Sequence, residues 1–396
     1  MSGLTDHPIT RRIPQRVARL SERMTWIAAG GAAVLLAGLW LSPERAWAAL
    51  LAGSFAMVCL GLAGLVFVAI QYASGAVWSI VLRRVAEAMT AALPAGAAGI
   101  LLVLLARPSL YPWHAHAVEG EGWIGFKTLW LSYPFFIGRA IIFICVWLAF
   151  RWLILSHSAR QDQEGGAELS RQNTRASVIF LIAFAFTFWL AATDWVMSLE
   201  PAWSSTIFGI YHFSGMFVAG VAVVALLTVL LRETGPLRSS VTEDHLHDLG
   251  RLLIAFSTFW GYIWFSQYML IWYTNLPEET TYIALRTQSG WGKLFAINVI
   301  LNWALPFLVL LPGKNKRNPH TLAAAALLIL AGRVTDLYVM ILAPISPYSP
   351  VPSLWDLAAL ALVTGGFTVL ALRAYFQAEP VPIGDPLLPA SVQGHA

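Results

Sequence analysis

Charged residues are scarce in this sequence. Asp, Glu, Lys and Arg make up 12% of its 396 residues, whereas 58% of the residues are hydrophobic. A soluble domain carries about a quarter charged residues, so this composition excludes an ordinary soluble protein. It predicts an integral membrane protein whose chain lies almost entirely within the bilayer.

Cysteine and membrane-embedded histidine are also scarce. Only two cysteines occur, Cys59 and Cys145, both in apolar runs, which excludes a disulfide framework, an iron–sulfur cluster and a metal–thiolate site. A b-type haem needs histidine pairs on facing helices, and His212 is the only histidine well inside an apolar segment. The sequence has no CxxCH haem-attachment motif and no phosphate-binding loop. We therefore expect this chain to bind no cofactor and no metal.

Ten apolar segments are long enough to cross about 30 Å of hydrocarbon. They predict an all-α integral membrane protein with a membrane domain at 25–377, a basic arm at 1–24 and a Pro-rich tail at 378–396. The predicted spans are approximately 25–41, 49–74, 86–106, 134–156, 176–198, 206–231, 250–274, 292–312, 320–344 and 353–376.

Lysine and arginine alternate between the two sides of these spans. They gather in the N-terminal arm and in every second loop, whereas the other loops hold only Arg45, Arg107, Lys127 and Arg286. Because cytoplasmic loops carry the excess of basic residues, both termini are predicted to be cytoplasmic. The 275–290 loop is then external. Arg83, Arg84 and Glu87, at the inner end of a span, are expected to extend to water.

The segment 259–279 has unusual contents for a membrane helix. At helical spacing it presents two faces, one with Tyr262, Ser266, Met269 and Tyr273 and the other with Trp260, Trp264, Gln267 and Ile271. Polar groups in hydrocarbon need partners, so we expect this helix to lie inside a bundle. An aromatic belt at the membrane surface is the alternative for its outer end.

Ionisable and phenolic side chains in or beside the spans are candidates for a proton path. They are Asp194, Glu200, His212, Tyr262, Tyr268, Glu278, Arg333 and Asp336. The acids gather toward the external side, which suits a proton half-path. Structural roles are the alternative: Asp194 pairs with an arginine or caps a helix, and His212 is a core histidine. Arg333 and Asp336, three residues apart on one helix face, would form an ion pair.

Three motifs carry a family resemblance. DWVMSLEPAWSSTIFGIYHFSG (194–215), FWGYIWFSQYMLIWYTNLPEET (259–280) and GRVTDLYVMIL (332–342) resemble the ActF membrane subunit of bacterial alternative complex III. That complex is a quinol:electron-acceptor oxidoreductase, and its membrane subunits resemble the NrfD/polysulfide-reductase-like integral membrane family. The chain departs from the pattern at Ala202, where a larger polar or aromatic residue is expected, which removes one member of the implied proton route.

The resemblance implies an architecture and a set of partners. It implies two four-helix bundles, from spans two to five and six to nine, with flanking helices. The partners would be a sister NrfD-like membrane subunit, an iron–sulfur subunit and cytochrome c subunits, so iron–sulfur clusters and haem c would lie in partner chains. Quinol would be the substrate of the complex, with its pocket mainly in the sister subunit. The bacterial inner membrane would be the location.

Three functions stay open at this point. The first is a non-haem subunit of a quinol oxidoreductase complex with a structural and a proton-conducting or quinone-associated role. The second is a quinone-binding catalytic subunit in its own right. The third is a secondary transporter, although such proteins often have broken helices at matched positions in two repeats, and no matched mid-span Gly or Pro breaks occur here.

Overall fold

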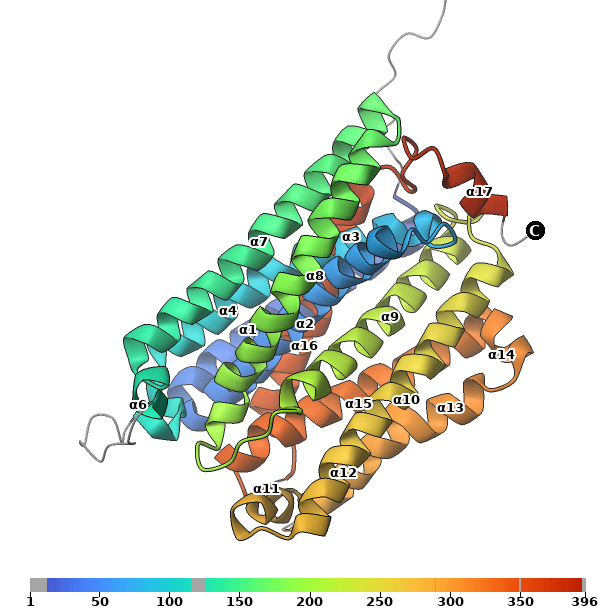
Figure 1. Cartoon of the computed structure of the whole chain (residues 1–396). Coiled ribbons are helices and arrows are strands. Elements are labelled where there is room, and N and C mark those ends of the chain that lie inside the picture. Colours follow the sequence, from blue (N-terminus) through green and yellow to red (C-terminus); the bar gives the residue numbers. More distant parts are fainter. Residues whose placement is uncertain (1–12, 115–125, 289, 349, 394–396) are drawn as a thin grey trace, which may run out of the picture.

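Ten long helical segments run side by side in the computed structural model, which describes residues 13–114, 126–288, 290–348 and 350–393 (Figure 1). This part of the chain contains no strand. The ten segments are α1 (Gln15–Leu41), α2 (Pro43–Ser74), α3 (Arg83–Met89) continued by α4 (Leu93–Ala106), α7 (Tyr133–Glu164), α8 (Glu168–Trp195), α9 (Phe208–Thr234), α10 (Glu243–Thr274), α12 (Trp291–Val299) continued by α13 (Leu305–Leu310), α15 (Pro319–Ile345) and α16 (Leu354–Phe376).

Every predicted span coincides with one of these segments. By length and composition, nine of the helices in the described ranges can cross a membrane. The remaining long helix, α10, has 32 residues but carries the polar and aromatic side chains noted above. The all-α membrane fold is therefore confirmed, and most helices extend beyond their apolar runs. For example, α1 begins at Gln15, inside the predicted basic arm.

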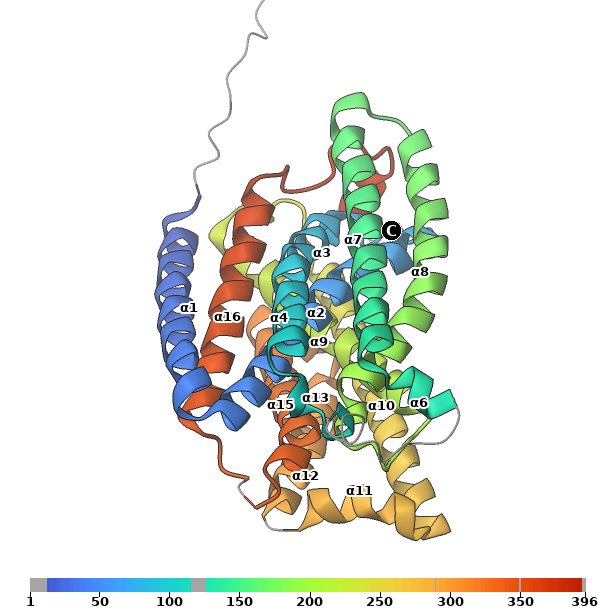
Figure 2. The same cartoon turned by 90° about the vertical axis from the view of Figure 1, so that its left-hand side faces the viewer.

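The helices form two four-helix bundles with one flanking pair. The first bundle contains α2, α3–α4, α7 and α8, and the second contains α9, α10, α12–α13 and α15. Helix α2 also packs on α9 and α15, which joins the bundles. The first and last long helices, α1 and α16, pair with each other along one flank (Figure 2).

Small residues allow α1 and α16 to approach closely. A Cβ added at Gly31 would lie 2.6 Å from the carbonyl oxygen of Ala358, and one at Gly365 would lie 2.5 Å from that of Met24. Membrane helices associate through such small-residue contacts because the surrounding lipid removes most of the hydrophobic drive.

The start of α1 and the end of α16 lie at one end of the bundles, here called the terminal face (Figure 2). The opposite end, here called the loop face, carries α11 (Pro277–Thr287). A loop was predicted at 275–290, and that prediction is wrong for most of it. Pro277 at the first helical position, two glutamates in the first turn and Arg286 in the last turn are the sequence features that favour this helix.

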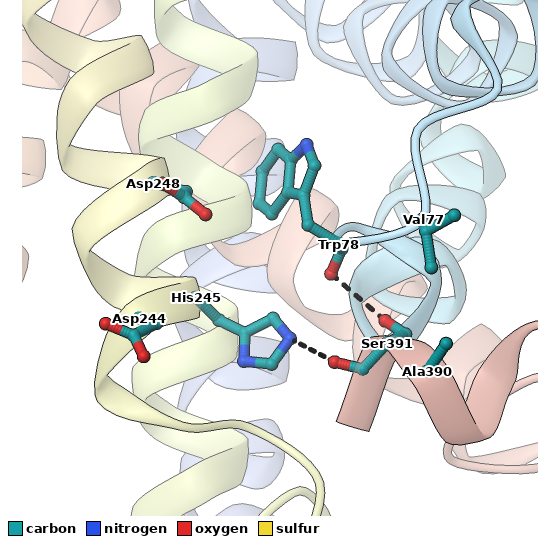
Figure 3. Close-up of a pocket in the computed structure, with 7 residues that line it drawn as sticks. All are labelled: Val77, Trp78, Asp244, His245, Asp248, Ala390 and Ser391. Atoms are coloured by element: carbon teal, nitrogen blue, oxygen red, sulfur yellow. Dashed lines mark hydrogen bonds between the residues drawn. The ribbon is translucent and has the colours of Figure 1, made fainter. Parts of the chain in front are cut away.

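The C-terminal segment returns across the terminal face (Figure 1). Asp385 accepts a hydrogen bond from the Arg83 guanidinium at 2.7 Å. In the short helix α17 (Leu388–Gln393), Ser391 donates from its hydroxyl to Trp78 at 3.1 Å and accepts at its carbonyl from His245 at 3.0 Å (Figure 3). The tail thus ties α3 of the first bundle to α10 of the second.

Arg84 and Glu87 lie in a buried cluster of charges beneath this tail. The expectation that their side chains extend to water is therefore wrong. Arg84 is 4% exposed and Glu87 is 6% exposed, and they form an ion pair at 2.5 Å. Arg84 also pairs with Asp162, and Glu87 accepts from the Ser158 hydroxyl at 2.6 Å. The charges are neutralised within the protein because α7 extends to Glu164 and covers them.

The aromatic helix α10 buries only one of its two predicted faces. Trp260, Gln267 and Ile271 are at most 7% exposed, as expected for a helix inside a bundle. The other face points outward, with Tyr262 64% exposed and Tyr273 81% exposed, so that part of the prediction is wrong. Helix α10 packs mainly on α9, on α13 and on the short helix α14 (Gly313–Arg317), so its opposite side has no helix packed against it among the described residues.

Candidate functional site

The carboxylate of Asp336 is the centre of a polar cluster deep in the second bundle. Asp336 is fully buried and accepts hydrogen bonds from Arg333 Nη1 at 2.5 Å, from Asn298 Nδ2 at 2.5 Å and from the Tyr211 hydroxyl. We call Tyr211, Asn298, Asn302, Arg333 and Asp336 the Asp336 cluster. Three helices, α9, α12–α13 and α15, supply its members.

The local sequence makes room for the guanidinium of Arg333. Its spacing of three from Asp336 places both side chains on one face of α15. On the facing helix, a Cβ at Gly215 would lie 2.1 Å from Arg333 Cζ, so the guanidinium occupies the space that any other residue would fill. The ion pair predicted from the spacing is therefore present, and a glycine on α9 makes it possible.

The two asparagines extend the cluster along the α12–α13 segment. Asn302 Nδ2 donates to the carbonyl oxygen of Asn298 at 3.0 Å and to its side-chain oxygen at 2.5 Å. Pro306 has no N–H for the carbonyl of Asn302, and the helix widens into a π-turn at Ile300–Ala304 just before it. Such turns are frequent at functional sites, and this one lies against Gly332 of α15, where a Cβ would be 2.6 Å from Asn302 Nδ2.

A second cluster lies directly between the Asp336 cluster and the loop face. Arg286 of α11 is 1% exposed and donates to Glu200, to the Met340 carbonyl at 3.2 Å and to the Tyr282 carbonyl at 3.1 Å. The Tyr282 ring stacks on Trp203 at 3.8 Å, and burial raises the pKa of its hydroxyl, which therefore stays protonated. We call these residues the Arg286 cluster.

The two clusters are stacked along α15. Met340 contacts Arg286 through its carbonyl and receives the Tyr282 hydroxyl at its sulfur at 2.9 Å. It stands one helical turn from Asp336. Glu200 at the loop face, Arg286, Met340 and Asp336 therefore follow one another from the loop face to the middle of α15.

This polar succession does not continue to the terminal face. In the described second bundle, the stretches 216–231, 305–310 and 321–332 contain no charged residue and no histidine. The buried hydroxyls of Thr228 and Ser257 have no hydrogen-bond partner among the described residues. On α10, Arg251 carries a charge in the corresponding stretch, but its side chain is 67% exposed. Beyond the Asp336 cluster itself, the nearest described polar contacts therefore lie on its loop-face side.

Asp194 forms a separate ion pair in the first bundle. Its two carboxylate oxygens accept from Arg139 at 2.9 and 3.0 Å, and one of them also accepts from Trp130 Nε1 at 3.0 Å. The guanidinium of Arg139 lies 3.9 Å from the centre of the Trp130 ring. Asp194 therefore pairs with an arginine, which is the structural alternative that the sequence suggested. No described contact links Asp194 to the Asp336 cluster.

His212 stands at the junction of the two bundles. Its ring contacts Phe208 at 4.5 Å and Phe55 of α2 at 5.5 Å between centroids, and it is 1% exposed. Neither ring nitrogen has a hydrogen-bond partner in the part of the chain that the structure describes. His212 is therefore an aromatic core residue beside the cluster and not a link in its hydrogen bonds.

Three other candidates from the sequence lie away from these clusters. Tyr262 points outward from α10, and Tyr268 stacks on Trp264 at 5.7 Å near the same surface. Glu278 is exposed in the first turn of α11. The structure therefore brings together only Glu200, Arg333 and Asp336 from the predicted set.

The sequence interpretation missed Tyr211, Asn298, Asn302, Tyr282 and Arg286. The two asparagines had a usable signal, because two amides four residues apart in an apolar run each need a partner. Arg286 had been assigned to an external loop as an orientation marker, and only the tertiary structure shows that it is buried.

No group of three or more His, Cys, Asp or Glu side chains with metal-binding geometry occurs among the described residues. Comparisons of the sequence with known protein families and with curated proteins find no match.

Replacing Arg286 with Gln is expected to loosen α11 while the bundles stay folded. The change leaves Glu200 without its counter-charge and removes two bonds to main-chain carbonyls, a loss of about 1–3 kcal/mol for unsatisfied buried groups. Amide hydrogen exchange across 277–287 should accelerate. Arg160, which pairs with Glu164 where both side chains are more than half exposed, is the control, and Arg160→Gln should change nothing measurable. Equal effects of the two changes would contradict the role of Arg286.

Proposed function

We propose that this chain is a non-haem integral membrane subunit of a quinol:electron-acceptor (cytochrome c type) oxidoreductase complex. In this proposal it conducts protons between the loop face and the buried Asp336. Iron–sulfur clusters and haem c in partner subunits would carry the electrons, beside a sister membrane subunit in a bacterial inner membrane. The observation that supports the proton role is a buried carboxylate in the middle of α15, with a second polar cluster between it and the loop face.

The Asp336 cluster has the chemistry that a proton acceptor needs. A carboxylate at mid-membrane is costly unless compensated, and three donors compensate it here. When Asp336 takes a proton, its attraction to Arg333 weakens and the guanidinium is free to turn to another acceptor. The Tyr211 hydroxyl, which both donates and accepts, is the group placed to pass the proton. A buried acid beside a guanidinium that changes partner on protonation would be a two-state element.

The motifs around these residues support the same assignment. Asp336 and Arg333 lie in the third motif that resembles the ActF subunit, and Glu200 and Tyr211 lie in the first. The test is purification from native membranes in a mild detergent. We expect co-purification with haem-bearing and iron–sulfur subunits and with quinol:cytochrome c activity, while the separated chain shows no haem absorbance. A solute transporter would purify without redox-active partners, and that result would reject the proposal.

The proposal also requires that the loop face be external. In a variant without Cys59 and Cys145, single cysteines would be placed at Ser239, in the turn between α9 and α10, and at Thr287, at the end of α11; both positions are exposed. A membrane-impermeant maleimide added to intact cells should label only the Thr287→Cys protein. Labelling of the Ser239→Cys protein in intact cells would reverse the topology.

A further inference from the structure

An apolar crevice separates the α1–α16 pair from the second bundle. It has a volume of about 490 Å³, and α2 forms its floor. Among the described residues, no extended contact joins α1 or α16 to α9 or α15, and small side chains such as Ala56 and Ala219 leave the space between them unfilled. The lining on α15 runs from Leu327 to Leu342, which is about 22 Å along the helix axis. The crevice therefore extends through much of a hydrocarbon layer of about 30 Å.

The polar side chains of this lining are engaged within the protein. Those that carry oxygen or nitrogen are Arg333, Tyr338, Asp356, Thr364 and Thr368. Arg333 is held by Asp336, whereas Tyr338 and Asp356 are both held by Arg45 of α2. The Thr368 hydroxyl donates to a main-chain carbonyl of its own helix at 2.7 Å. The remaining lining is almost entirely hydrocarbon, so the part of an occupant inside the crevice is an apolar chain.

Three arginines of α1 lie at the end of the crevice that is nearest the terminal face. Leu20 and Met24 line this end. Arg16 lies one turn before Leu20 and Arg23 lies three residues after it, so both are on the same side of α1 as Leu20. Arg19 is three residues from Arg16 and four from Arg23, and all three are exposed. We call these three residues the α1 arginines.

The described residues provide no carboxylate that pairs with the α1 arginines. Glu22 is two residues after Leu20 and therefore lies on the opposite side of α1. Across the crevice, Glu233 near the end of α9 is 3.8 Å from His320 of α15. The α1 arginines thus place positive charge without a described counter-ion beside an apolar space.

Trp26 indicates the depth of these arginines in the membrane. It is 73% exposed and lies three residues beyond Arg23 in the direction of the loop face. Exposed tryptophans of membrane helices gather at the boundary between headgroups and hydrocarbon. Side chains of a helix also lean toward its N-terminus, which for α1 is the terminal face. The guanidiniums therefore lie at headgroup level, and the crevice continues from there into the hydrocarbon.

We propose that the crevice holds an anionic phospholipid of the terminal-face leaflet, with its phosphate on the α1 arginines and one acyl chain along α2. Arginine binds phosphate through parallel N–H donors, and the apolar lining accepts the chain. A helix of a partner protein, about 10 Å across, would need several times the volume of the crevice over the same length. The proposal assigns no ligand to Arg333 and rests on no part of the proposed function.

The first experiment measures the preference for an anionic head. The purified protein, with any subunits that accompany it, is washed free of lipid and titrated with dioleoyl phosphatidylglycerol or dioleoyl phosphatidylcholine. The two lipids carry the same chains and differ only in their heads. Native mass spectrometry gives the number bound and the affinity. We expect one phosphatidylglycerol per chain to bind at least tenfold more tightly than phosphatidylcholine, because each arginine near an anionic lipid contributes about fivefold.

Arginine variants locate the head of the lipid. Arg23→Gln should lower the affinity for phosphatidylglycerol about fivefold, and Arg16→Gln with Arg23→Gln should lower it about 25-fold. The matched control is Arg175→Gln in the second turn of α8. Arg175 is also exposed and has no described carboxylate partner, but it does not line the crevice. Its replacement should leave the affinity unchanged.

A second pair of variants locates the chain. Ala56→Phe adds a ring to the floor of the crevice and should weaken the binding of both lipids at this site by the same factor. Ile142→Phe adds the same ring on the outward face of α7, where Ile142 is 59% exposed, and should leave both affinities unchanged.

Each of four results would overturn the proposal. They are equal affinity for the two lipids in the wild-type protein, unchanged affinity in the Arg16 and Arg23 double variant, equal losses in Arg23→Gln and Arg175→Gln, and unchanged binding in Ala56→Phe. Equal losses in the two arginine variants would show only a general attraction between a basic face and anionic lipid. The proton proposal is measured separately, by quinol-driven proton release, and survives each of these results.

Discussion

Changing Asp336 to Asn is expected to remove most of the folded protein from the membrane, and adding Arg333→Gln is expected to restore it. The single change leaves a buried guanidinium without its counter-ion, which costs about 3–5 kcal/mol. The double change removes both charges from a site where Arg333 is 5% exposed and Asp336 is fully buried. The amount of monodisperse protein after detergent extraction measures the effect. The exposed Arg160–Glu164 pair, neutralised in the same way, should give wild-type amounts.

The double variant also separates a structural ion pair from a proton acceptor. If Asp336 takes up protons, the assembled complex with Arg333→Gln and Asp336→Asn should show little quinol-driven proton release. Wild-type turnover and proton release in that complex would leave only a structural ion pair. Each activity must be normalised to assembled complex, because the single variants are expected to assemble poorly.

A methyl group at Gly215 is expected to disable the same cluster without changing any charge. In Gly215→Ala the new Cβ would stand where the Arg333 guanidinium now lies, within 2.3 Å of Cζ and both terminal nitrogens. The clashing atoms are the end of a flexible side chain, so the guanidinium can move aside, but the movement draws Nη1 away from Asp336. We therefore expect a loss of up to about 3 kcal/mol, the lower end of the cost of a broken buried pair, together with reduced proton release.

Gly138 on α7 provides the matched control. A Cβ at Gly138 would have no atom within 4 Å, so Gly138→Ala meets no neighbour. It should stabilise the helix by up to about 1 kcal/mol, because alanine favours the helix more than glycine does. Thermal unfolding of the two variants in detergent makes the comparison. A Gly215→Ala protein that unfolds at the wild-type temperature and releases protons normally would contradict the proposed geometry.

The sequence predicted the spans well because their signal is local. An apolar run of about twenty residues fits a bilayer whatever its neighbours are, and the i, i+3 spacing of Arg333 and Asp336 is a property of one helix. The outward face of α10 could not be predicted in this way. Tyr262 looks the same in the sequence whether its helix is central or at the edge of a bundle, and α10 lies at the edge.

The candidate site was less predictable because it is made of contacts between distant segments. Arg286 and Glu200 pair across 86 positions, and Tyr211 reaches Asp336 across 125. Burial of Arg286 depends on α11 folding back over the bundle, which the spacing of apolar residues does not encode. Gly215 gave no signal either, since a glycine in an apolar run becomes meaningful only once the guanidinium opposite it is known.

The pairing of α1 with α16 has a consequence for biogenesis. Chains emerge from the ribosome N-terminal end first, so α1 is inserted long before its main partner is made. Until α16 arrives, the face of α2 that it will cover is open to the bilayer. Insertion of the last span closes that face and completes the helix pair. In the finished protein, α1 and α16 can separate only by breaking the close contacts at Gly31 and Gly365.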